Sequence, residues 1–186
     1  MKIHDFQPSE AIAFEQRTTG ISFFSAVAVG AVSAVMWLFL SNIHFDLTFI
    51  LGYKPTFWLW PPNYFFVDQL AENHIAKHDA LLFLNSGAVT SLLYLLWLVG
   101  RLIFEFVARR HRYVSKDVLT ICALALIPII FVAFKPFSEE YSRYSLSFEA
   151  SVQSNIFHNI IIIGGFYACL GESLAKIISL IRVKMQ

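Results

Sequence analysis

Cysteine is scarce in this sequence. The 186 residues contain only Cys122 and Cys169, which lie far apart in the chain and inside apolar segments. No C-x-x-C pair is present. This spacing argues against a disulfide framework, a zinc site or a membrane thiol oxidase, and it favours two small buried hydrophobic side chains.

Charged residues are scarce as well. Asp, Glu, Lys and Arg make up 15% of the chain, against 57% hydrophobic residues, and the net charge is +1. Soluble domains carry about 25% charged residues, so the composition predicts a protein whose main solvent is the lipid bilayer. Because a nucleic-acid binder carries its basic residues as a broad patch on a folded face, we expect no direct binding of nucleic acid.

Sequence motifs of enzymes are also missing. There is no Gly-rich phosphate loop and no Ser-His-Asp arrangement with clear spacing. Nor is there a pair of carboxylates inside an apolar segment, which a proton-coupled carrier would use. We therefore expect a protein that is not an enzyme and has no cofactor, while a passive pore lined by Ser, Thr and Asn stays open.

The stretch from residue 80 to residue 116 predicts the topology. It starts with an apolar segment that carries no charge between Asp79 and Arg101. A basic cluster follows at once, formed by Arg101, Arg109, Arg110, Arg112 and Lys116. A helix needs about 20 apolar residues to cross the hydrocarbon core. Because basic residues mark the cytoplasmic side, this helix should end in the cytoplasm.

Three further apolar segments complete a predicted bundle. We expect membrane spans over residues 20–43, 80–104, 118–134 and 152–175, outer loops over 44–79 and 135–151, and a cytoplasmic link over 105–117. The third span is short, and Pro128 should kink it. The predicted fold is all-α: a single membrane domain over residues 1–186, forming a polytopic four-transmembrane-helix bundle in the inner membrane with both termini cytoplasmic.

Small residues recur at every third or fourth position in the first and last of these spans. Such stripes let helix backbones approach closely in lipid, either within one chain or between copies. We expect them to make the protein a homo-oligomer. The seam residues are Ser22, Ala26, Gly30 and Ala34 in the first span and Gly164, Ala168, Gly171 and Ala175 in the last.

The first outer loop is crowded with aromatic residues. Trp58, Trp60 and Tyr64 lie around Pro61 and Pro62. Trp and Tyr prefer the headgroup layer and a Pro-Pro pair ends a helix, so we expect a segment that lies on the outer membrane surface or is partly re-entrant. Its simplest role is an aromatic belt that anchors the bundle. The alternative is an outward platform that contacts lipid, a toxin or an incoming particle.

Four of the six histidines gather near the outer boundary in this arrangement, namely His44, His74, His78 and His158. His74 and His78 are four residues apart and would share one helix face, so they are weak candidates for a metal or haem site. No H-E-x-x-H motif is present. A solvated cap at the start of the second span is therefore the simpler interpretation, and we expect no metal.

The expected partner site lies on the cytoplasmic side. Its residues are Arg101, Arg109, Arg110, Arg112 and Lys116, with Lys176 beyond the last span. Anionic lipid alone would explain these basic groups, at about 1 kcal/mol each. The sharper hypothesis is a docking site for a cytosolic protein. Glu172 and Lys176 are four residues apart, which predicts an ion pair on a helix that continues past the membrane.

This layout resembles two bacterial groups. Four spans, both ends inside, a long first outer loop, a basic link over residues 101–116 and a shorter second outer loop are similar to the membrane subunit of Kiwa anti-phage systems, which works with a cytosolic DNA-binding partner. They are also similar to the immunity proteins against pore-forming colicins. The resemblance implies a membrane sensor or scaffold that holds a cytosolic effector in anti-phage defence, or else an immunity protein that binds a pore-forming toxin in the membrane.

Overall fold

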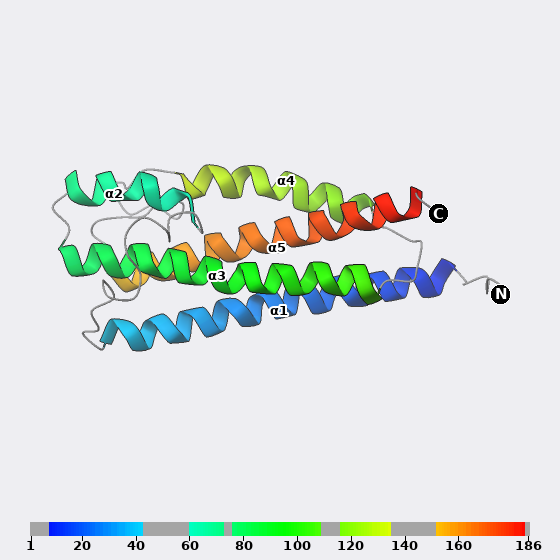
Figure 1. Ribbon diagram of the computed structural model, residues 1–186, viewed down its shortest axis with the longest axis horizontal. Coiled ribbons are helices and arrows are strands. Elements are labelled where there is room, and N and C mark those ends of the chain that lie inside the picture. The colour runs from blue at the N-terminus through cyan, green and yellow to red at the C-terminus, as the bar shows by residue number, and fades with distance from the viewer. Residues whose placement is uncertain (1–7, 43–59, 73–75, 109–115, 135–151, 185–186) are drawn as a thin grey trace.

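The computed structural model describes residues 8–42, 60–72, 76–108, 116–134 and 152–184, and the regular elements in these ranges are all helices. They are α1 (Pro8–Asn42), α2 (Pro62–Glu72), α3 (Lys77–Ala108), α4 (Lys116–Ala133) and α5 (Val152–Lys184) (Figure 1). The predicted all-α class is confirmed for the described part of the chain.

Three of the helices are long and apolar enough to cross a membrane. These segments are Ile12–Leu40 in α1, His78–Val107 in α3 and Gln153–Ile181 in α5, with mean hydropathies of 2.2, 1.7 and 1.6. The apolar part of α4, Asp117–Ala133, is shorter. With its 18 residues, α4 is about 27 Å long, slightly less than the roughly 30 Å hydrocarbon core. Pro128 lies inside this helix, as the sequence indicated.

The long helices extend further than the expected spans. The first was expected from residue 20, but α1 starts at Pro8, and α3 and α5 continue to Ala108 and Lys184. These extensions carry charged residues, whereas the expected spans were defined by apolar segments. The helices continue there because several of those charged side chains pair with one another inside the bundle.

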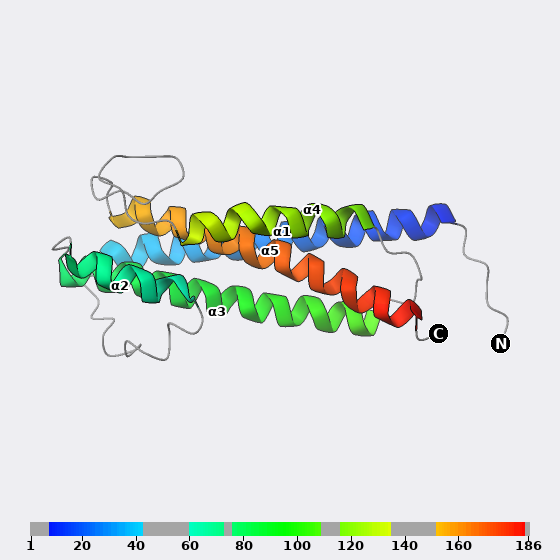
Figure 2. The ribbon, with the colours of Figure 1, turned by 90° about the horizontal axis from the view of Figure 1, so that it is seen from above.

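Helices α1, α3, α4 and α5 lie side by side, and α5 packs against the other three (Figures 1 and 2). Helices α1 and α3 also contact each other. Successive long helices run in opposite directions, so the start of α1, the end of α3, the start of α4 and the end of α5 lie at one end of the bundle. The short helix α2 packs along α3 at the opposite end.

The Pro61-Pro62 pair begins a helix, whereas we expected it only to end one. The backbone amides of Asn63 and Tyr64 donate to the carbonyl oxygens of Trp60 and Pro61, at 3.0 and 3.1 Å, and α2 starts at Pro62. Proline is well placed in the first turn of a helix, where its missing N–H would have had no partner within the helix. The middle of the expected outer loop is therefore helical.

The bundle exposes many large apolar side chains on its outside, while several small polar ones are buried inside beside its apolar core. Phe24, Phe131 and Ile161 are 80%, 81% and 74% exposed, while Ser33 and Thr90 are fully buried. A soluble protein of this size would not expose so much contiguous apolar surface. This distribution suits a bundle whose sides face lipid and whose helices approach through small residues.

Both small-residue stripes pack inside one copy of the chain. Ser22, Ala26, Ala168 and Ala175 are 3%, 3%, 7% and 0% exposed, and Gly30, Ala34, Gly164 and Gly171 are buried or half-buried. Bulky side chains of α3 fill the space that the glycines leave: a Cβ on Gly164 would lie 2.5 Å from the Tyr94 hydroxyl, and one on Gly171 would lie 2.9 Å from the Trp97 ring. The seams thus join helices of a single copy, and a homo-oligomer stays a prediction.

Candidate functional site

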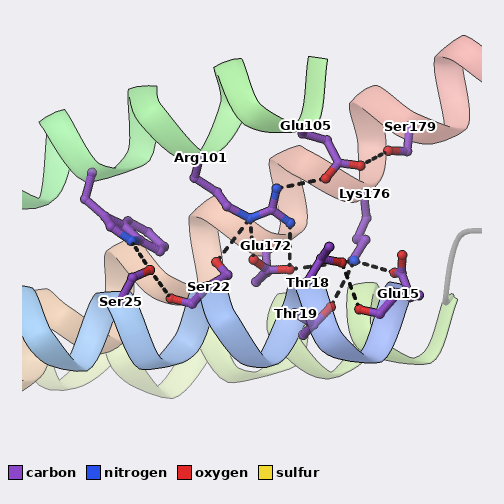
Figure 3. Close-up of polar contacts among 11 residues, drawn as sticks. Glu15, Thr18, Thr19, Ser22, Ser25, Arg101, Glu105, Glu172, Lys176 and Ser179 are labelled. Carbon is purple, nitrogen blue, oxygen red and sulfur yellow. Dashed lines mark hydrogen bonds and ion pairs between the residues drawn. The ribbon is translucent and has the colours of Figure 1, made fainter. Parts of the chain in front are cut away.

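A cluster of buried charged side chains lies at the end of the bundle where α1 begins and α3 and α5 end (Figure 3). Its members are Glu15 of α1, Arg101 and Glu105 of α3, and Glu172 and Lys176 of α5. None of these residues is more than 7% exposed. We call this cluster the ion network. It gathers five buried charged side chains in one place inside the bundle.

Arg101 is the centre of the ion network. Its Nε donates to Glu172 Oε1 at 2.9 Å and to Ser22 Oγ at 3.1 Å. Its Nη1 donates to Glu105 Oε2 at 2.8 Å, and its Nη2 donates to Glu172 Oε2 at 3.3 Å. One planar guanidinium therefore connects α1, α3 and α5, which the single ammonium group of a lysine could not do with the same geometry.

Lys176 makes the second connection between helices. Its Nζ donates to Glu15 Oε1 and, at 3.2 Å, to Thr19 Oγ1, so α5 is tied to α1. The same Nζ lies 3.7 Å from Glu172 Oε2, one turn earlier in α5. The Glu172–Lys176 pair expected from the sequence is confirmed, but it is buried and belongs to a larger network.

Hydroxyl groups and an indole surround these charges. Ser179 Oγ donates to Glu105 Oε1, and Thr18 Oγ1 donates to the carbonyl oxygen of Glu15 at 3.0 Å. Trp97 Nε1 donates to Ser25 Oγ at 2.8 Å, one turn of α1 beyond Ser22 (Figure 3). Hydroxyl groups of α1 and α5, on Ser22, Thr19 and Ser179, thus add to the polar partners that buried charges require.

The contacts of the ion network are those of a structural connection between helices. Taking each ion out of water costs several kcal/mol, which only close pairing and further hydrogen bonds can offset. Here each of the five charged side chains has an oppositely charged partner within 4 Å. A groove of about 320 Å³ beside Arg101, between α1 and α3, is lined almost wholly by apolar atoms. The arrangement therefore fixes how three helices sit against one another.

Two residues of the expected partner site are inside the bundle. Arg101 is 7% exposed and Lys176 is 0% exposed, so the prediction that these two side chains dock a soluble protein is wrong. Each faces a carboxylate on another helix, which holds it inward. Of the remaining residues, Arg109, Arg110 and Arg112 lie outside the described residues, and the structure describes only the backbone of Lys116, the first residue of α4.

Sequence reasoning missed the ion network, although two signals pointed to it. Arg101 and Glu105 are four residues apart, as are Glu172 and Lys176, and both pairs follow long apolar segments. Opposite charges at this spacing share a helix face. Two such faces at the same end of a bundle can be buried against each other. Glu15 adds a charged group from a third helix, the first in the chain.

The expected outer aromatic surface is only partly present. Tyr64 is 50% exposed, and its place at the outer membrane surface stays a prediction. Trp60 is 3% exposed and packs edge-on against Phe166 of α5 with ring centroids 6.0 Å apart, so its prediction as a surface residue is wrong. Its indole is large and apolar enough to fill the space between α2 and α5. Trp58 lies outside the described residues.

The candidate metal ligands do not form a group in the described part of the chain. His78 is exposed at the start of α3, and His158 is half-buried on α5. His44 and His74 lie outside the described residues. Within residues 8–42, 60–72, 76–108, 116–134 and 152–184, no three His, Cys, Asp or Glu side chains are placed to hold a metal ion.

The two cysteines meet in the structure. Both are free thiols, and Cys122 on α4 lies close to Cys169 on α5. Their separation in sequence gave no sign of this contact. It places the middle of α5 against the first half of α4.

An apolar groove of about 560 Å³ lies between α1 and α5. Small residues form much of its lining, among them Gly30 and Gly164 of the two stripes and their neighbours Ala31 and Gly165. Larger apolar side chains such as Phe23 and Phe157 complete it. Its lining suits an apolar occupant such as a lipid chain or the side chains of another helix.

Comparisons of the chain with protein-family models, with curated proteins and with solved structures find no match.

Proposed function

We propose that this is a multi-pass protein of the inner membrane with four crossings and both termini in the cytoplasm. Three helices have the length of a span, and α4 runs beside α5 for most of that length. The start of α1 and the end of α5 lie at the same end of the bundle, as an even number of crossings requires. The basic segment between α3 and α4 starts from this end, which favours the cytoplasmic side.

Within this topology, the protein acts as a sensor or scaffold with no catalytic step of its own. An event at the outer surface acts on α2 and the neighbouring loops, and a cytosolic effector is held at Arg109, Arg110, Arg112 and Lys116. The resemblance in layout favours anti-phage defence as the setting, with several copies assembling in the membrane.

The ion network is the observation that carries this proposal. Glu105 lies one helical turn before Arg109, and it is fastened through Arg101 to α1 and α5. A movement of any of these helices at the outer end would therefore be passed to the segment that bears the arginines. Burying several charges is costly, and a protein that only needed to pack three helices could use apolar side chains instead.

The effector site is tested by reversing its charge. The variant in which Arg109, Arg110 and Arg112 are all changed to Glu should lose a cytosolic protein that co-purifies with the wild type in detergent, while staying in the membrane fraction. Arg17→Glu is the matched control, because Arg17 is exposed on α1 at the same end of the bundle. A complex that survives the triple change would rule out this site.

A second function is favoured by the groove between α1 and α5. As an immunity protein, the chain would use this groove to seat a helix of a pore-forming toxin, since small residues permit close approach. Cells that express the chain should then survive one such toxin. Ala31→Trp, which fills the groove, should abolish survival, whereas Ala28→Trp on another exposed part of α1 should not. Protection against no member of a toxin panel would dispose of this function.

A further inference from the structure

Three buried polar side chains converge on Gly87 of α3, in the half of the bundle that contains α2. They are Trp60, just before α2, Asn63 of α2 and Asn159 of α5, with exposures of 3%, 0% and 2%. This place is far from the ion network, which lies at the other end of the helices. None of the three residues has a part in the functions proposed above.

The geometry around Gly87 is tight and specific. A Cβ placed on this glycine would lie 3.0 Å from Asn63 Oδ1, 3.0 Å from Asn159 Nδ2 and 3.0 Å from Trp60 Cδ1. The Trp60 indole nitrogen is bonded to that Cδ1 atom. The missing side chain therefore lets an amide oxygen, an amide nitrogen and an indole ring approach the same point beside the Gly87 Cα.

Three hydrogen-bonding groups on these side chains have no partner among the described residues: Asn63 Oδ1, Asn159 Nδ2 and Trp60 Nε1. The other end of the Asn63 side chain is engaged, because its Nδ2 donates to the carbonyl oxygen of Leu84 at 2.7 Å. That bond fixes which way the Asn63 amide points and directs its oxygen toward Gly87. Unpaired buried groups are rare in folded proteins, and three around one point call for a common partner.

We infer that one ordered water molecule is bound over Gly87 and joins α2 to α5. Asn159 Nδ2 and Trp60 Nε1 are donors, and Asn63 Oδ1 is an acceptor. A cation would be repelled by the two N–H groups, and an anion by the amide oxygen. Water can accept two hydrogen bonds and donate a third, which matches this set.

The bound water gives Gly87 a definite role. Helix α2 packs along α3, and Trp60, just before α2, makes an edge contact with Phe166 of α5. The water adds a polar bridge between the start of α2 and the outer part of α5. Any side chain at position 87 would occupy or crowd its place.

A structure of the wild-type protein at a resolution that shows ordered water tests this directly. We expect density within hydrogen-bonding distance of Asn63 Oδ1, Asn159 Nδ2 and Trp60 Nε1. A well-defined site without such density would overturn the inference.

Substitutions at Gly87 give an independent test through the melting temperature in detergent. If water is bound, Gly87→Ser should melt at a higher temperature than Gly87→Ala, because a serine hydroxyl can take over part of its bonding and a methyl group cannot. Gly100 of α3 is the control, since a Cβ there meets nothing within 4 Å. At that position alanine should be the more stable, because it is the better helix former. The same order, alanine above serine, at both positions would contradict a bound water.

Discussion

Arg101 of α3 and Glu172 of α5 form a bidentate ion pair inside the bundle, with Nε–Oε1 and Nη2–Oε2 distances of 2.9 and 3.3 Å. The two side chains are 5% and 1% exposed. Because two parallel hydrogen bonds require the guanidinium and the carboxylate to be coplanar, this pair sets the register of α3 against α5. A sliding movement of either helix would break it.

Removing Arg101 should be among the most harmful single changes in the chain. Arg101→Met removes the cation that the buried carboxylates of Glu105 and Glu172 share, which should lower the free energy of unfolding by about 3–5 kcal/mol. Arg17→Met removes an exposed arginine and should change it by no more than about 0.5 kcal/mol. Denaturation in detergent micelles measures both. Similar losses in the two variants would contradict a buried network.

Glu15 and Lys176 should behave as a coupled pair. Each single change, Glu15→Gln or Lys176→Met, removes one partner of the ion pair that joins α1 to α5. The double variant should therefore be more stable than the sum of the two losses predicts, with a coupling energy of about 0.5–3 kcal/mol. A double-mutant cycle on unfolding free energies measures this term. Strict additivity would mean that the two side chains do not interact.

The Tyr94 hydroxyl occupies the gap between two glycines. It donates to the carbonyl oxygen of Ala26 at 2.9 Å, and a Cβ on Gly30 would lie 2.7 Å from it. Gly30→Ala should therefore destabilise the protein, by about 1–3 kcal/mol. Tyr94→Phe should relieve most of this loss, because the nearest ring carbon lies 3.9 Å from the same point.

Gly164 provides the contrast to Gly30. Here a Cβ would lie 3.1 Å from a Tyr94 ring carbon as well as 2.5 Å from the hydroxyl. Tyr94→Phe should thus rescue Gly164→Ala less well than it rescues Gly30→Ala. Melting temperatures of the single and double variants decide this. Equal rescue at both positions would mean that the Tyr94 ring lies no closer to α5 than to α1.

The long helices could be predicted from the sequence because the signal for them is local. An uncharged run such as the one from Asp79 to Arg101 has the length of a membrane span whatever surrounds it. The start of the first helix was misplaced at residue 20. Charged residues before it were taken as a sign of water, whereas Glu15 is a charge buried by Lys176 on another helix.

The site could not be predicted in the same way, because its contacts join distant parts of the chain. Counting arginines near a span indicates a side of the membrane but not a face of a helix. Arg101 was assigned to the surface for this reason, although its partner Glu172 lies 71 residues away. The meeting of Cys122 and Cys169 likewise depends on how α4 packs against α5.

That meeting makes the natural cysteines a probe of the packing. A membrane-permeant reagent that links two nearby thiols should join Cys122 to Cys169 within one chain, since the two side chains lie close together. Both free thiols should disappear without the formation of a covalent dimer, as thiol counting and denaturing gels report. Cys122→Ser should leave Cys169 unlinked. Linked dimers in the wild type would instead place these thiols at a contact between copies.

The number and direction of the crossings can be tested with single cysteines in a Cys122→Ala, Cys169→Ala background. Tyr64 suits an outer reporter because it is 50% exposed, whereas its neighbour Asn63 is fully buried. Tyr64→Cys should react with an impermeant maleimide from the outer side, and Arg110→Cys should react only from the cytoplasmic side. The opposite pattern would mean that the protein has the inverse orientation in the membrane. The basic link would then be out of reach of any cytosolic effector.

Phe134 decides between three and four crossings. It follows the last residue of α4, is 47% exposed, and lies toward the same end of the bundle as α2. If α4 crosses, Phe134→Cys should react from the outer side together with Tyr64→Cys. At about 27 Å, α4 needs only slight thinning of the bilayer to do so. Reaction of Phe134→Cys from the cytoplasmic side alone would mean that α4 does not cross, and that the chain passes through the membrane an odd number of times.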